Sequence, residues 1–176
     1  SVQFTFAGND TEGLKCGTIG TEEKSCLKWK ETKQDVPRFK LDKYLLKPCE
    51  KNRLIELIDD FILFDGGIKK LPRAHQYFGI KAAQQAVLEE RGGIIWHTQG
   101  SGKSLTMVWL AKWIREHVTN ARVLIVTDRT ELDEQIEKVF LGVNENIYRT
   151  KSGADLVATL NETKPWLVCS LVHKFG

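Results

Sequence analysis

Residues 97–104 read HTQGSGKS and have the types and spacing of a loop that binds phosphate. Gly100 and Gly102 allow a tight turn whose backbone N–H groups point inward at an anion. Lys103 supplies a cation for the β- and γ-phosphates, and Ser104 supplies a hydroxyl ligand for Mg²⁺. The pattern therefore predicts that the chain binds a nucleotide. The residues expected around the phosphates are Thr98, Gln99, Gly100, Ser101, Gly102, Lys103, Ser104 and Leu105.

A strand and a helix are expected to hold this loop. Residues 92–96 (GGIIW) have the pattern of a short buried strand, and residues 105–118 have that of an amphipathic helix. The positive end of the helix dipole would add to the attraction for phosphate. His97 replaces the first glycine of the general motif, a position that helicase-type loops relax. Core positions are predicted at Leu105, Val108, Ile114 and the tryptophans Trp96, Trp109, Trp113 and Trp166.

The rest of the chain divides into three zones. Residues 1–34 alternate in polarity and predict a β-hairpin with its turn at residues 8–10. Residues 35–71 form a connector with one helix between Leu54 and Ile62, ended by Gly66-Gly67. Residues 72–176 alternate helices with continuous apolar strands, which predicts an α/β fold with a parallel sheet. The strands of this last zone are expected at 93–96, 123–126 and 166–169, and its helices at 72–90, 103–117, 130–140 and 153–160.

Two further positions have side chains suited to ligand contacts. The amide of Gln76 can donate and accept at once, and so could read adenine, although a plain polar helix residue would look the same. Thr127-Asp128-Arg129 follows the second predicted strand, at the edge of a parallel sheet that faces ligands. Arg129 could therefore contact a nucleic-acid backbone or a partner lobe. Asp128 or Thr130 is expected to cap the next helix.

Composition places few limits on function. The 176 residues include 26 basic and 23 acidic side chains, a net charge of +3 spread along the chain, so composition alone does not indicate nucleic acid. The four cysteines have neither C-x-x-C nor zinc spacing, which favours reduced thiols. We find no signal peptide and no apolar run near the roughly 20 residues that span a bilayer.

The string from Gly92 to Ser104 resembles the nucleotide loop of the motor (R, restriction) subunit of type I restriction–modification enzymes. Its Trp-His-Thr-Gln-Gly-Ser-Gly-Lys-Ser run is the specific part. The resemblance covers residues 50–176 well and residues 1–49 more weakly. Supporting matches are residues 75–78 (HQYF), residues 126–129 (VTDR), Leu132, Gln135 and residues 170–175 (SLVHKF).

The resemblance implies a RecA-like motor lobe over residues 72–176, preceded by a helical linker over 35–71 and the end of a nuclease-side domain over 1–34. It implies a large, cytoplasmic bacterial or archaeal subunit that hydrolyses ATP with Mg²⁺ and translocates double-stranded DNA, together with methylation and specificity subunits. Carried over to this sequence, Lys103 and Ser104 would be catalytic and hold phosphate and Mg²⁺. Gln76 would hold adenine, and Arg129 would lie near DNA or the second lobe.

Hydrolysis also needs an acidic pair that follows a later strand. The only Asp-Glu dipeptide, Asp133-Glu134, falls inside a predicted helix, so we reject it. We expect the pair and a second lobe after residue 176, and hence ATP binding with negligible turnover by this chain. Asp10, Glu31 and Lys33 superficially form a nuclease set, but a solvated loop explains them and the nuclease motif is expected before residue 1.

Three alternatives stay open at this point. Another superfamily 2 helicase or translocase, acting on DNA or RNA, would share this lobe. A nucleotide-binding interaction module that never hydrolyses ATP would share the loop alone. A small-molecule kinase is disfavoured because no lid or acceptor-site pattern follows the loop.

Overall fold

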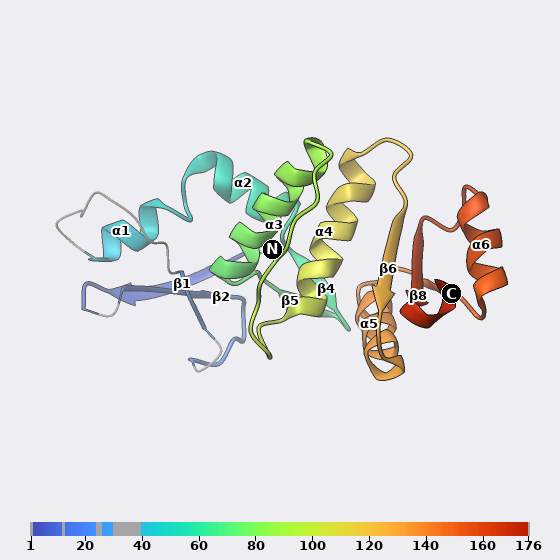
Figure 1. Cartoon of the computed structure of the whole chain (residues 1–176). Helices are drawn as coiled ribbons and strands as arrows, with labels where there is room; N and C mark the ends of the chain where they lie inside the picture. The colour runs from blue at the N-terminus through green and yellow to red at the C-terminus, as the bar shows by residue number, and fades with distance from the viewer. Residues whose placement is uncertain (1, 12, 24–25, 30–39, 176) are drawn as a thin grey trace. The chain divides into compact units, whose positions relative to one another are not determined.

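A computed structural model describes residues 2–11, 13–23, 26–29 and 40–175 (Figure 1). The chain forms two compact units. Residues 1–63 and 68–82 make up the first unit, and residues 64–67 and 83–176 make up the second. Within the described residues, no helix is long and apolar enough to cross a membrane.

The first unit begins with a three-stranded antiparallel sheet. Strand β1 (Thr5–Asn9) pairs with β2 (Gly13–Gly17), and β2 pairs on its other side with β3 (Leu27–Lys28). The predicted hairpin is confirmed, but its turn was placed too early. Gly8 and Asn9 still belong to the ladder, where they face Leu14 and Gly13.

Helices α1 (Lys40–Leu46) and α2 (Lys51–Asp59) follow, then a hairpin of β4 (Leu63–Asp65) and β5 (Ile68–Lys70). Helix α2 begins where it does because the Glu50 carboxylate accepts hydrogen bonds from the N–H groups of Asn52 and Arg53, at 3.2 and 2.9 Å. Gly66 and Gly67, with φ of +56° and +81°, form the turn of the hairpin and do not end a helix.

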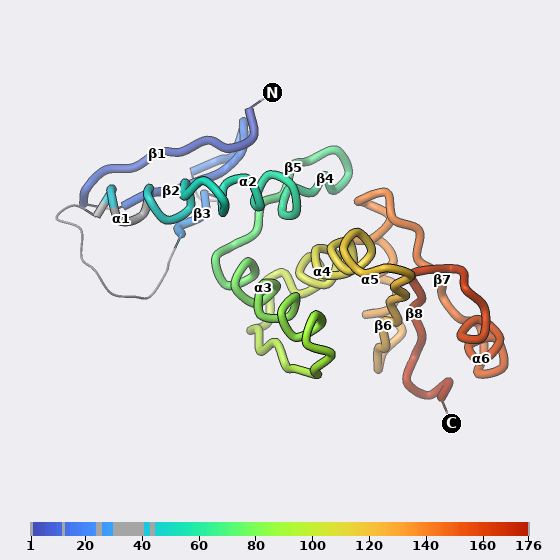
Figure 2. Tube along the Cα trace, turned by 90° about the horizontal axis from the view of Figure 1, so that it is seen from above, coloured from blue at the N-terminus to red at the C-terminus, as the bar shows by residue number. Residues whose placement is uncertain are grey.

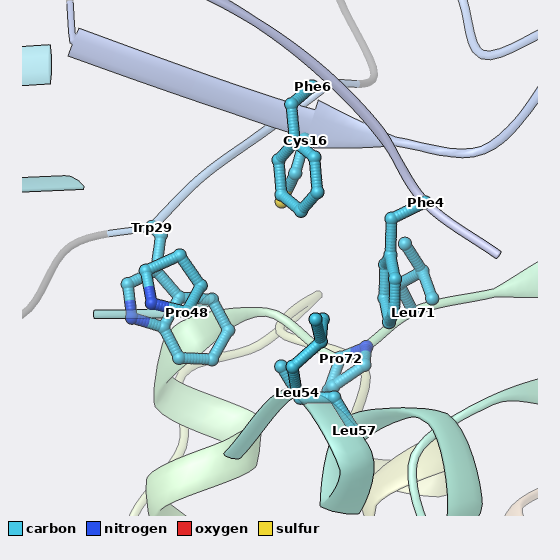
Figure 3. A pocket seen from close by; sticks show the side chains of 9 residues that line it. All are labelled: Phe4, Phe6, Cys16, Trp29, Pro48, Leu54, Leu57, Leu71 and Pro72. Atoms are coloured by element: carbon cyan, nitrogen blue, oxygen red, sulfur yellow. The ribbon is translucent and has the colours of Figure 1, made fainter. Parts of the chain in front are cut away.

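The core of the first unit is apolar and closely packed. Figure 3 shows side chains of the β1–β2 hairpin on one side of a small cavity and side chains of α2 and the following chain on the other. Its volume is about 20 Å³, space for one water molecule, but the lining offers almost no polar partner. The cavity is lined by Phe4, Phe6, Cys16, Trp29, Pro48, Leu54, Leu57, Leu71 and Pro72.

Helix α3 (Ala74–Leu88) leads into the second unit, which contains a parallel sheet. The strands are β6 (Val123–Thr127), β7 (Tyr148–Arg149) and β8 (Leu167–Leu171), in the order β6-β8-β7. All five residues of the central strand β8 are buried. This parallel sheet confirms the predicted α/β class, although the two-residue strand β7 was missed.

Three helices and a 3₁₀ turn accompany this sheet (Figure 2). They are α4 (Lys103–His117), α5 (Thr130–Gly142), α6 (Gly153–Asn161) and the turn η2 (Val172–Phe175). The observed bounds match the predicted helices to within two residues, and α5 packs against both β6 and β8. Trp109 and Trp113 of α4 are buried as predicted.

The strand predicted at residues 92–96 is wrong. These residues form no strand, and Ile94 and Trp96 are 91% and 89% exposed. A strand needs a neighbour to share backbone hydrogen bonds. In the part of the chain that the structure describes, β6 pairs only with β8, and no strand lies beside residues 92–96. Trp96 is accordingly not a core residue.

Candidate nucleotide and nucleic-acid site

The loop at residues 97–104 has the backbone of a phosphate cradle. Gly100 and Gly102 take positive φ values of +73° and +84°, in the left-handed region that favours glycine. The N–H and the hydroxyl of Ser101 both donate to the carbonyl of Thr98, at 3.3 and 2.7 Å, and so close the turn. No atom lies within 4 Å of a Cβ built on Gly100, so backbone conformation alone requires this glycine.

Lys103 and Ser104 stand at the first turn of α4, as predicted. The ammonium of Lys103 reaches back across the loop to the carbonyl of Thr98, at 3.0 Å, on an exposed side chain. Helix α4 begins at Lys103, and its N-cap residue Gly102 has no side chain to cap the helix, so the N–H groups of the first turn can face an anion. Donors and a cation thus converge as a phosphate group with Mg²⁺ would need, and Ser104 is half-buried beside them.

Gln76 lies in the first unit and is only 3% exposed. Its side-chain oxygen accepts a hydrogen bond from the backbone N–H of Arg73, at 2.9 Å. This contact ties the side chain to the start of α3, as in the reciprocal half of a capping box. The expected contact with adenine stays a prediction.

Thr127, Asp128 and Arg129 lie at the carboxyl end of β6, where the sequence placed them. Arg129 projects from the surface, with a side chain 77% exposed and its Nε 3.5 Å from the Asp128 carboxylate. The predicted cap is wrong. The N-cap residue of α5 is Arg129, whose guanidinium has no acceptor atom for the helix N–H groups. The Asp128 carboxylate lies beside Arg129, and Thr130 is already the first helical residue.

Comparison with known proteins identifies the family. The profile of the SWI2/SNF2 ATPase family matches residues 75–176, more than half of the chain. The chain belongs to the SWI2/SNF2 ATPase family. The matched region includes Gln76, the phosphate loop and Arg129, so the candidate residues all fall within the ATPase part.

Several curated relatives of the chain are subunits of restriction enzymes. It is 34% identical over 152 residues to a putative type I restriction enzyme MjaIXP endonuclease subunit of Methanocaldococcus jannaschii, a match that covers 80% of this chain and 14% of the relative. It is 33% identical over 111 residues to the HindI endonuclease subunit of Haemophilus influenzae, covering 55% and 10%. It is 25% identical over 175 residues to the SauCOLORF180P endonuclease subunit of Staphylococcus aureus, covering 97% and 18%.

The chain is therefore a homologue of type I restriction endonuclease subunits, and it spans less than a fifth of the length of these relatives. The sequence resemblance to that family is confirmed. Asp133-Glu134 lies within α5, as predicted from the sequence. Glu31 and Lys33 lie outside the described residues, and the Asp10 carboxylate accepts a hydrogen bond from the N–H of Leu41, at 3.3 Å.

One polar cluster in this chain was not predicted from the sequence. The carboxylate of Asp133, 4% exposed, accepts hydrogen bonds from Nε of Arg149, at 2.6 Å, and from the thiol of Cys169, at 2.7 Å. Arg149 also donates to Glu137, at 2.9 Å. The cluster joins α5 to β7 and β8. Its signal in the sequence is the spacing of Asp133 from the apolar Ile136 and Phe140, which puts a carboxylate on the buried face of α5.

The pKa values of this cluster follow from burial and hydrogen bonding. Burial, and next the hydrogen bond to Asp133, raise the pKa of the Cys169 thiol to about 12. Cys169 is therefore a protonated donor at neutral pH and a poor nucleophile. The hydrogen bond to Asp133 is also the main cause that raises the pKa of Arg149. The cluster is built to hold three elements together.

Proposed function

We propose that this chain is the ATP-binding part of an ATP-dependent translocase that moves double-stranded DNA in type I restriction. The observation that carries the proposal is the cradle at residues 97–104, with two left-handed glycines and the ammonium of Lys103 drawn across the loop. The named activity of the relatives, as type I restriction enzyme endonuclease subunits, supports the class of reaction.

Each loop residue has a role in this proposal. The N–H groups of the loop and of the first turn of α4 bind the phosphates, and Lys103 leaves Thr98 to pair with their outer oxygens. Ser104 supplies a hydroxyl to Mg²⁺, which when bound neutralises phosphate charge. Gln76 reads adenine, for which its amide must exchange the hydrogen bond from Arg73 for one to the base.

The proposed DNA contact is made by Arg129. Its exposed guanidinium stands at the carboxyl end of β6 and can pair with a backbone phosphate. A net charge of only +3 favours few phosphate contacts, so we expect weak DNA binding with a shallow dependence on salt. Methylation and specificity subunits are the proposed protein partners, in the cytoplasm of a bacterium or archaeon.

Catalysis is proposed to need more than these residues. The sequence offers one Asp-Glu pair, and it lies inside α5, where the Asp133 carboxylate is already engaged by Arg149 and Cys169. We expect Mg–ATP to bind with negligible turnover. A steady-state phosphate-release assay on the 176-residue chain checks this expectation, and multiple turnovers per minute would contradict it.

Isothermal titration with ATP, with and without Mg²⁺, tests the nucleotide site. We expect Mg²⁺ to tighten binding by the wild type about tenfold, equivalent to about 1.4 kcal/mol. Ser104→Ala should lose this increment and keep metal-free binding. Thr163→Ala, which removes an exposed hydroxyl after α6, should behave as wild type. Equal Mg²⁺ dependence in all three proteins would contradict the role of Ser104, and no ATP binding by any would contradict the proposed function.

A further inference from the structure

The start of α5 is held by a buried carboxylate and not by a helix cap. No side chain caps it, since the N-cap residue is the exposed Arg129. The fourth residue of the helix, Asp133, instead buries its carboxylate against the sheet. A buried carboxylate is stable only where donors surround it, which confines Asp133 to one place.

Two neighbouring strands supply those donors. Arg149 is the last residue of β7, and Cys169 is the middle residue of β8. The two residues are paired in the parallel β7–β8 ladder. The residues that follow Arg149 and Cys169 in the chain are linked as well, because the hydroxyl of Thr150 donates to that of Ser170, at 2.8 Å. The carboxylate is thus anchored on a rigid pair of strands.

This anchor reaches the Thr-Asp-Arg turn through the backbone. The N–H of Asp133 donates to the carbonyl of Arg129, at 3.1 Å, one helical turn earlier. Movement of Asp133 would therefore move the backbone of Arg129. We infer that Asp133 is a positioning residue, which aims Arg129 at the phosphate backbone of double-stranded DNA. The inference rests on the DNA contact proposed above.

A purely stabilising role makes a different prediction from a positioning role. If Asp133 only stabilises the fold, its loss lowers the melting temperature, and the molecules that stay folded bind DNA as wild type does. If Asp133 positions Arg129, folded variants lose DNA affinity. Moreover, the losses from Asp133 and Arg129 are then not additive, because both act through one contact.

The experiment measures the affinity of the 176-residue chain for a short fluorescent double-stranded DNA, by anisotropy at low salt. The variants are Arg129→Ala, Asp133→Asn and the double variant, each checked by circular dichroism to be folded at the assay temperature. Glu134→Gln is the matched control, since it removes one negative charge from the exposed neighbour of Asp133. Mg–ATP affinity is measured alongside and should change little in any variant.

We expect Arg129→Ala to weaken DNA binding about fivefold, as for the loss of one phosphate contact, and to make it less dependent on salt. Asp133→Asn should weaken it about as much, although removal of a negative charge by itself favours DNA. The double variant should bind no more weakly than Arg129→Ala, and Glu134→Gln should bind at least as tightly as wild type. Arg149→Lys, which keeps the charge but loses the Nε donor, should show a smaller loss and serves if Asp133→Asn does not fold.

Two results would overturn the inference and separate it from the proposed function. If Arg129→Ala weakens binding while folded Asp133→Asn and Arg149→Lys match wild type, Asp133 has no positioning role and the proposed DNA contact stands. If Arg129→Ala binds DNA as wild type does, or if the wild type does not bind, the proposed contact fails and the inference fails with it.

Discussion

The two candidate functional turns of this chain are held in opposite ways. The phosphate loop at residues 97–104 is shaped by its own backbone, with two glycines at positive φ and hydrogen bonds that converge on the carbonyl of Thr98. Residues 92–96, which precede the loop, are exposed and pair with no described strand. The turn at residues 127–129 follows a paired strand and precedes a helix fixed by the buried Asp133.

One turn is shaped by adjacent residues, and the other is held by tertiary contacts with residues far away in the sequence. A loop defined by glycine conformation and a helix N-terminus can form from a short stretch of sequence. The turn at residues 127–129 has no helix cap and depends instead on distant residues. These are Arg149 and Cys169, which lie 20 and 40 positions after Arg129 in the chain. The two turns should therefore respond to different substitutions.

The largest expected effect distinguishes the two sides of the phosphate loop. Trp109, in the helix after the loop, is 1% exposed, whereas Trp96, in the segment before it, is 89% exposed. Trp109→Ala should destabilise the fold by about 3–5 kcal/mol, because it removes a large buried side chain. Trp96→Ala, the matched control, should change stability by less than about 0.5 kcal/mol. Urea denaturation measures both, and equal losses would show that residues 92–96 are packed after all.

A smaller effect tests local control of the loop. Gly100→Ala meets no atom within 4 Å but must adopt φ of +73°, a strain of about 1–2 kcal/mol for a residue with a Cβ. We expect this loss of stability together with weaker Mg–ATP binding. Gly92→Ala is also uncrowded and carries no positive φ, so it should be neutral. A neutral Gly100→Ala, measured in the same denaturation series, would contradict the backbone account of the loop.

The same contrast between local and distant control explains which parts of the molecule could be predicted from the sequence. The loop and α4 were predicted well because HTQGSGKS and the helix after it are read from adjacent residues. The prediction of a strand at residues 92–96 was wrong because a run of apolar residues indicates only that a segment favours burial. A strand forms only where a neighbouring strand shares its backbone hydrogen bonds.

The turn at residues 127–129 also shows where prediction from local sequence fails. Asp128 and Thr130 have the residue types of a helix cap, yet α5 has none. The carboxylate that fixes the helix is Asp133, and its partners become neighbours only when β7 and β8 align. Spacing against Ile136 and Phe140 could have placed Asp133 on the buried face, but spacing alone names neither Arg149 nor Cys169.

The smallest expected effect comes from the half-buried carboxylate of Asp155, in α6. The pKa of Asp155 is lowered by the backbone N–H of Lys151 first and then by the hydroxyl of Tyr148. A lowered pKa contributes stability above the unfolded value, about 3.9 for Asp, and that stability is lost as the pH falls through the folded value. Asp155→Asn should therefore lower the melting temperature slightly at pH 7 and flatten its fall below about pH 4. Melting curves from pH 7 to pH 2 would contradict this if both proteins lost stability in parallel.

The central claim is that residues 97–104 form a cradle for the phosphates of ATP, and thermal unfolding with and without Mg–ATP tests it most directly. At about 100 times the dissociation constant, ATP should stabilise the wild type by about 2.7 kcal/mol, roughly 5–10 °C for a chain of this size. Lys112→Ala, which removes another lysine of α4, should keep the shift, and Lys103→Ala should lose it. An equal shift in Lys103→Ala, or none in the wild type, would contradict the account.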